Sequence, residues 1–222
     1  MNLAFSKTII ITFLFIIFTG DYLMGQSSLG IEPKKITKAD KVIMELICRE
    51  FPIDKTTFYN TTPDNNSPYW IRGLKRYQAM DENWITADPP GPPITFIVNP
   101  ANEIFRSMAE ALSSIKYVPK DDEDALKAAI MIANQSSHPK GSVIVDSNGK
   151  ADGIPKDVLS KYDIAPSVVK NGKEYNIIVF SWVSFETQNK FVRGYHSLWK
   201  HMVAIDGYAY KEAIKILWEK KD

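Results

Sequence analysis

The chain has 222 residues, with 27 Lys and Arg against 26 Asp and Glu, so its formal net charge is +1. A chain with such balanced charge has no overall field that favours nucleic acid or an anionic membrane, and neither is expected as a partner. The single cysteine, Cys48, cannot form an internal disulfide, so the fold must be stabilised by its apolar core.

The N-terminal segment predicts export. Lys7 is followed by an apolar run over residues 8–18 and a polar, small-residue stretch over 19–21, the layout of a secretory signal peptide over residues 1–25. A membrane-spanning helix needs about 20 apolar residues, so no stable membrane insertion is expected after signal removal; retention as an anchor is the alternative. We therefore expect a secreted or periplasmic protein with a single domain over residues 26–222.

The first helix is predicted to begin beside Thr37. Thr37 and Asp40 have the spacing of a capping box. The apolar residues that follow at helical spacing are Val42, Ile43, Leu46 and Ile47. Cys48 lies at the edge of this stripe, so we expect a buried and inert thiol.

Residues 58–93 have the composition of a loop region that is rich in Pro and aromatic residues. Trp70 and Trp84 lie in this region, which also holds basic residues, so cation–π contacts are available to the guanidinium groups. Two interpretations are open: the rings form a partner-binding surface, or they pin the segment to the core.

A short β-rich run over residues 94–98 predicts a strand, and Asn99 with Pro100 is predicted to cap and start a second helix. The apolar face of that helix would consist of Ile104, Phe105, Met108, Leu112 and Ile115. The acidic run over 121–124 directly precedes a third helical pattern, where a helix N-terminus stabilises negative charge. A metal site formed by the same carboxylates is the alternative.

Residues 146–157 resemble the start of a calcium-binding loop. However, Lys150 stands where an oxygen ligand is needed, and Ala151 stands where glycine is needed. Asn148 and Gly149 follow an apolar run and are typical of a hairpin turn instead. No metal site and no cofactor is therefore expected.

Three long β-rich runs close the chain, over residues 175–185, 191–205 and 208–218. The dipeptide at 206–207 predicts a two-residue hairpin turn that pairs Ile205 with Tyr208. This register places His201 directly opposite Glu212.

A looser turn over residues 186–190 would place Tyr175 beside the same imidazole, giving a polar ladder of Tyr175, His201 and Glu212 across three strands. A carboxylate beside an imidazole fixes its tautomer, as a general acid or base requires, but the same pair also serves as a plain cross-strand contact. No obvious nucleophile is predicted nearby. The predicted ligand-binding residues on this face are Tyr195, Trp199, His201, Tyr210, Glu212 and Trp218.

These elements predict an α+β fold, with about three helices packed on a twisted, mainly antiparallel sheet built from C-terminal long hairpins. The layout is similar in architecture to cone-shaped nuclear-transport-factor-like folds and to cystatin-like folds, an analogy that does not fix function. The leading hypothesis is a non-enzymatic exported module that binds a small apolar or aromatic molecule or a protein partner. The alternatives are a cavity hydrolase or isomerase that uses the His–Glu pair, and a structural envelope protein with an aromatic interface.

Overall fold

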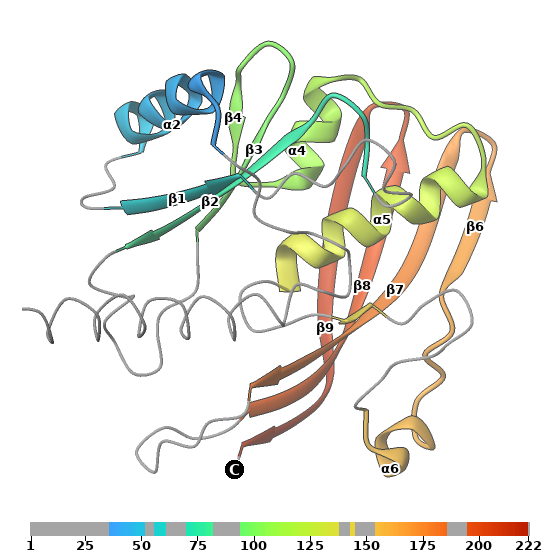
Figure 1. Cartoon of the computed structure of the whole chain (residues 1–222). Helices are drawn as coiled ribbons and strands as arrows, with labels where there is room; N and C mark the ends of the chain where they lie inside the picture. Colours follow the sequence, from blue (N-terminus) through green and yellow to red (C-terminus); the bar gives the residue numbers. More distant parts are fainter. Residues whose placement is uncertain are drawn as a thin grey trace, which may run out of the picture.

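The computed structural model describes residues 36–51, 56–60, 70–81, 94–137, 143–144, 154–185 and 195–221. These residues form four helices and nine strands arranged in two antiparallel sheets, which confirms the α+β class (Figure 1). The sequence predicts one sheet and about three helices, so the second sheet is an addition. The segment predicted as a secretory signal lies outside the described residues. Within the described residues, no helix is long and apolar enough to cross a membrane.

The first sheet comes from the N-terminal half of the chain. Its strands are β1 (Thr56–Asn60), β2 (Lys75–Asp81), β3 (Ile94–Val98) and β4 (Ile104–Phe105), in that spatial order. Residues 58–93 are therefore not one loop region, because they include the end of β1 and all of β2. Helix α2 (Lys38–Glu50) packs on this sheet. The buried residues they share are Ile43, Met44, Ile47, Tyr77, Ala79, Phe96 and Val98.

Helix α2 has the predicted capping box, but its buried stripe is rotated from the predicted one. The backbone N–H of Asp40 donates to Thr37 Oγ1 at 3.2 Å, and the N–H of Thr37 donates to Asp40 Oδ2 at 2.8 Å. Tyr77 on β2 donates its hydroxyl to Asp40 Oδ1 at 2.8 Å, so Asp40 faces the sheet. Val42 is consequently 56% exposed, and Cys48 is exposed rather than buried.

Asn99 and Pro100 do not start a helix. The side-chain oxygen of Asn99 accepts hydrogen bonds from the backbone N–H groups of Ala101 and Glu103, both at 2.9 Å, which closes a tight turn. The chain then returns along β3 as the short strand β4. Helix α4 (Met108–Ser114) begins later, with Ser107 as its N-cap.

The second sheet is built from the C-terminal half. It contains β5 (Val143–Ile144), β6 (Ser167–Asn171), β7 (Glu174–Phe185), β8 (Tyr195–Asp206) and β9 (Ala209–Lys221). The spatial order is β5-β7-β8-β9, and β6 also pairs with β7. Helix α5 (Asp122–Ser137) crosses one face of this sheet, and the lower ends of β7, β8 and β9 extend beyond it (Figure 1).

The face that α4 and α5 cover is called the inner face here. Its core contains residues from both sheets and from both helices; members of the second sheet are Tyr175, Ile177, Val179, Val203, Ile205 and Tyr210. The prediction that the acidic run opens α5 is confirmed, because Asp121 Oδ1 accepts a hydrogen bond from the N–H of Asp124 at 2.9 Å. Acidic groups in this first turn stabilise the helix.

The opposite, outer face carries a separate small core. Helix α6 (Lys156–Leu159) and the residues beside it contribute to this core. Its buried residues are Ile154, Val158, Ile164, Phe180, Trp182 and Leu198. The rings of Trp182 and Trp218 stack there, with their centroids 5.6 Å apart.

The hairpin of β8 and β9 is present, but its turn differs from the predicted one by one residue. Asp206 pairs with Ala209, so the two loop residues are Gly207 and Tyr208. Gly207 has φ +58° and Tyr208 does not have a positive φ, the pattern of a type II′ turn with glycine first. A type I′ turn at 206–207 would require a positive φ at both central positions, which Asp206 adopts less readily.

Candidate functional site

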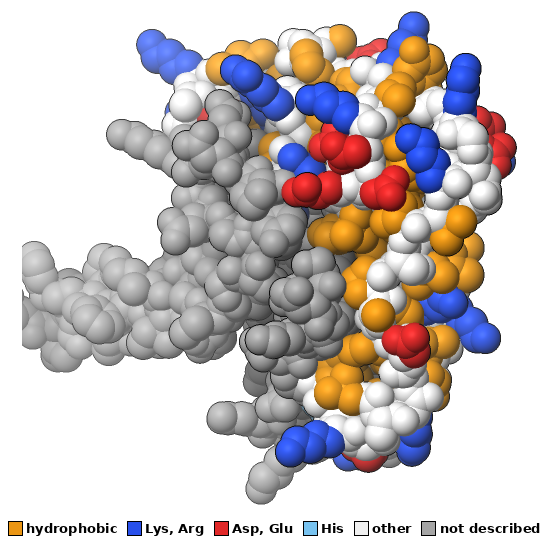
Figure 2. Space-filling model, turned by 90° about the vertical axis from the view of Figure 1, so that its right-hand side faces the viewer, with side chains coloured by type: hydrophobic (Ala, Val, Ile, Leu, Met, Phe, Trp, Pro, Cys, Tyr) orange, Lys and Arg blue, Asp and Glu red, His pale blue; other side chains and the backbone are white. Residues whose placement is uncertain are grey.

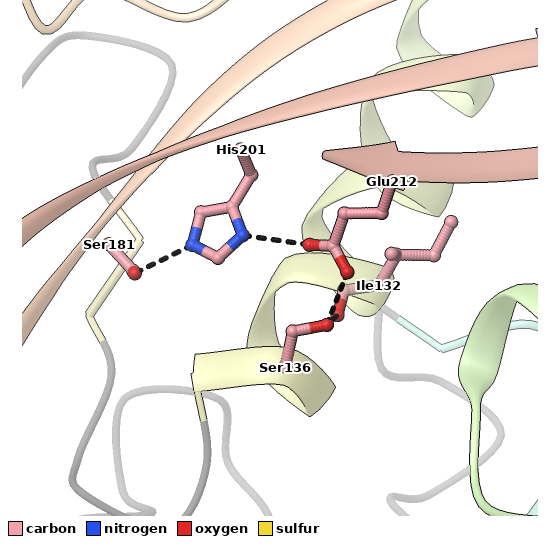
Figure 3. Close-up of polar contacts among 5 residues, drawn as sticks. All are labelled: Ile132, Ser136, Ser181, His201 and Glu212. Carbon is pink, nitrogen blue, oxygen red and sulfur yellow. Dashed lines mark hydrogen bonds and ion pairs between the residues drawn. The ribbon is translucent and has the colours of Figure 1, made fainter. Parts of the chain in front are cut away.

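His201 lies at the centre of a hydrogen-bonded chain that joins three strands (Figure 3). Its Nδ1 atom is 2.7 Å from Glu212 Oε1 on β9, and its Nε2 atom is 2.8 Å from Ser181 Oγ on β7. The side chains of Ser181 and His201 are fully buried, and that of Glu212 is 13% exposed. The predicted contact between His201 and Glu212 is therefore confirmed, but the residue directly opposite His201 is Ile214 and not Glu212, because the hairpin turn lies one residue further along the chain.

Helix α5 extends this chain. The hydroxyl of Ser136 lies between Glu212 Oε2, with which it forms a hydrogen bond, and the carbonyl oxygen of Ile132, 3.1 Å away (Figure 3). A hydroxyl has one proton to donate, so it serves one of these acceptors at a time. The chain thus connects the sheet to the helix that covers it, and both carboxylate oxygens of Glu212 have partners.

The order of partners determines the tautomer of the imidazole. A carboxylate only accepts hydrogen bonds, so Nδ1 donates to Glu212 and the neutral ring leaves Nε2 to accept from Ser181. A serine at one nitrogen and a carboxylate at the other is the connectivity of a Ser–His–acid triad. The backbone of Ser181 pairs with Ile144 on one side and with Trp199 on the other. Its neighbouring amides therefore serve the sheet rather than a developing oxyanion.

Tyr175 does not lie beside His201. The predicted second turn pairs Phe185 with position 191, whereas β7 and β8 pair Phe185 with Tyr195. Tyr175 is consequently opposite Ile205. Ser181, and not Tyr175, is the residue of β7 that lies beside the imidazole. The alternation of β7 does place Ser181 on the correct face, but nothing in the sequence near a loose turn fixes the register.

Tyr210 is on the predicted face, but its ring is part of the core. It is 8% exposed, and its hydroxyl donates to the carbonyl oxygen of Tyr117 at 2.9 Å. Burial and the nearby negative groups raise the pKa of its phenol. Tyr175, at 4% exposure, belongs to the same core.

Trp218 lies on the outer face, so the prediction that it shares a face with His201 is wrong. A β-bulge shifts the pairing between Leu198 and Trp199: Trp199 is opposite Ile216, whereas Leu198 is opposite Trp218. The extra residue in β9 reverses the alternation of side chains beyond it. Trp218 therefore joins the outer core beside Trp182.

A partly exposed apolar surface remains on the inner face, where β8 and β9 extend beyond α5. Ile214 and Ile216 are 44% and 48% exposed, and the half-buried Trp199 is directly opposite Ile216. The indole N–H of Trp199 donates to Ser197 Oγ at 2.6 Å, which orients the ring. We call Trp199, Ile214 and Ile216 the β9 patch. Tyr195, also half-buried, follows on the same face of β8.

Trp70, one of the two tryptophans of the predicted partner-binding surface, is buried. Trp70 is 8% exposed, and its indole N–H donates to the carbonyl oxygen of Leu74 at 2.9 Å, so its ring belongs to the inner core. Trp84 lies outside the described residues. The same is true of residues 145–153, which hold most of the calcium-like sequence. Among the residues that the structure describes, no group of three metal-ligating side chains is found.

The surface charge is mixed. On the face shown in Figure 2, acidic and basic side chains lie near one another and hydrophobic side chains lie between them. Comparison of the chain with protein-family models, with curated proteins and with solved structures finds no match. We therefore infer the function from the geometry of the site itself.

Proposed function

We propose that this protein is a non-enzymatic, exported binding module whose β9 patch recognises an apolar or aromatic group. The observation that carries the proposal is the exposure of Ile214 and Ile216 beside the half-buried Trp199, on a face where Val203, Ile205 and Tyr210 of the same two strands are buried. Full burial of a large aliphatic side chain contributes about 1.5–3 kcal/mol, so leaving nearly half of each isoleucine in water forgoes roughly half of that. A group of such side chains on a folded surface is typical of a binding site.

The polar chain beside the patch, on the same face of β8 and β9, supports recognition by a rigid surface. His201 is opposite Ile214, and its two ring nitrogens are already bonded to Ser181 and Glu212. A ligand is therefore not needed to satisfy these buried groups. Fixing the geometry of β8 and β9 before binding reduces the entropy that a ligand must overcome.

Export is supported by the sequence alone, through Lys7, the apolar run over residues 8–18 and the small residues before Gln26. Mass spectrometry of protein from the extracytoplasmic fraction should find Gln26 as the first residue. A full-length chain retained in the cytoplasm would refute this part of the proposal.

Recognition is tested by titrating purified protein with indole and following backbone and side-chain chemical shifts. We expect shifts at Trp199, Ile214 and Ile216, and their loss in the variant Ile216→Lys. The matched control is Met202→Lys, because Met202 is similarly exposed, at 37%, on the outer face of β8. Shifts confined to other residues, or equal losses in both variants, would contradict a recognition role for the β9 patch.

A second candidate function is hydrolysis, favoured by the triad-like order of Ser181, His201 and Glu212. A fluorophosphonate probe forms a covalent bond to an activated serine hydroxyl and releases fluoride. Hydrolysis predicts labelling of the native protein at Ser181 and no labelling after Ser181→Ala. The non-enzymatic proposal predicts no labelling of either protein.

A further inference from the structure

We propose that the free edge of β9 accepts an extended segment of a partner protein in which apolar and acidic residues alternate. The inference rests on the proposed function, because Ile214 and Ile216 of the β9 patch are part of the same edge. It adds the backbone geometry and the charge of the partner, neither of which follows from the patch alone.

The first observation is the length and position of the strand. β9 has 13 residues, more than twice the usual strand length of about 5–6. It is the last strand in the order β5-β7-β8-β9, and among the described residues no strand pairs with its other side. Helix α4 packs against the beginning of β9, where Tyr210 lies, and the rest of the strand extends beyond it (Figure 1). Such an edge presents a row of N–H and C=O groups that a further strand can pair with.

The second observation is the alternation of side chains along this edge. Ile214 and Ile216 lie on the inner face, and both are substantially exposed. Lys211 and Lys215 lie on the outer face and are exposed, with Ala213 between them. A strand added to β9 would place its own side chains alternately beside the isoleucines and beside the lysines.

The third observation is a local conflict of charge. Lys200 on β8 is directly opposite Lys215, and like charges in such a pair destabilise a sheet. Among the residues that the structure describes, no carboxylate forms an ion pair with Lys200, Lys211 or Lys215. An acidic side chain on an added strand would relieve this repulsion.

The charge also decides between a foreign strand and a second copy of the chain. Lysines along an edge oppose self-pairing, because a second β9 would bring its own lysines to the same surface. An acidic segment would instead be attracted to these lysines. Its apolar residues would cover the exposed isoleucines, so a strand of alternating glutamate and valine fits both faces.

The test uses a ten-residue peptide of alternating glutamate and valine. We expect it to bind purified protein, to slow hydrogen exchange at those amides of residues 210–216 that do not bond to β8, and to bind more weakly as salt is raised. The double variant Lys211→Glu with Lys215→Glu should bind it about tenfold more weakly. The control double variant, Lys38→Glu with Lys41→Glu, makes the same change in net charge at exposed positions of α2, which packs on the first sheet, and should bind normally.

Several results would overturn the proposal. These are equal binding of a lysine–valine peptide, undiminished binding of a peptide N-methylated at alternate residues, or binding without protection of β9 amides. A stable dimer that protects the same amides would show that a second copy occupies the edge. The indole titration separates the two proposals. If indole changes the chemical shifts of the β9 patch but the peptide does not bind, the edge inference fails and the proposed function stands.

Discussion

Glu212 forms a 2.7 Å hydrogen bond with His201, although the residue directly opposite Glu212 on β8 is Val203. The contact is therefore diagonal across the hairpin. Diagonal neighbours on one face lie about 7–8 Å apart at their backbones, a distance that a long side chain can span. The glutamate reaches along the strand to His201 and is held from above by Ser136 on α5.

Replacing His201 with alanine should cost about 3 kcal/mol of unfolding free energy, because it leaves the buried groups of Ser181 and Glu212 without their shared partner and opens a cavity. Urea unfolding followed by circular dichroism measures the loss. His196→Ala is the control, since His196 is on the same strand but on the outer face and is only half-buried. A loss no larger than that of the control would mean that the polar chain contributes little to stability.

Tyr77→Phe should affect stability in a pH-dependent way. At pH 7 the variant loses the hydrogen bond to Asp40, at a cost of about 2 kcal/mol. Burial, together with the hydrogen bond to Asp40 and its charge, raises the pKa of Tyr77 above the usual value. Above about pH 10 the unfolded chain therefore releases this proton and the folded chain keeps it, so stability falls as pH rises.

Phenylalanine has no such proton, so the difference between the two proteins should shrink as pH rises from 7 to 11. Unfolding curves in urea across this range provide the measurement. A difference that stays constant or widens would be inconsistent with a raised pKa at Tyr77.

Gly207→Ala should destabilise the protein by about 1–2 kcal/mol, because an L-residue with a side chain is strained at the observed φ of +58°. Space is not the limitation, since an added Cβ would meet no atom within 4 Å. Gly207→Asn should cost less, because asparagine tolerates this region better. Chemical denaturation ranks the three proteins, and an alanine variant as stable as wild type would exclude this turn geometry.

Cys48 should react with Ellman's reagent in the folded protein, since its thiol is exposed on α2. The absorbance change in native buffer should match that of protein unfolded in urea, both in amplitude and, closely, in rate. Reaction only after unfolding would support the burial that the sequence pattern predicts.

Features set by neighbouring residues could be predicted from the sequence. The strand at 94–98, the capping box at Thr37 and the acidic start of α5 each depend on residues within about one turn of one another. The face of β9 that carries Glu212 was also predictable, despite the misplaced turn. Moving a hairpin turn by one residue changes each cross-strand partner by two positions, and side chains two positions apart share a face.

Features set by distant residues could not be predicted. The rotation of α2 follows from the bond between Asp40 and Tyr77, which are 37 positions apart. The place of Ser181 beside His201 depends on a register that no tight turn fixes, and the outward position of Trp218 depends on a bulge that has no local sequence signal.

The bulge in β9 exchanges the two faces on which odd- and even-numbered side chains lie. Before position 217, even-numbered side chains lie on the side of α5, and after it odd-numbered ones do. Deleting one residue within the bulge would straighten the ladder and leave both halves facing as they do now. The same deletion at Ala213 would turn over every side chain between that point and one end of the strand. The number of residues in this strand, as well as their types, therefore determines whether Trp218 packs in the inner or the outer core.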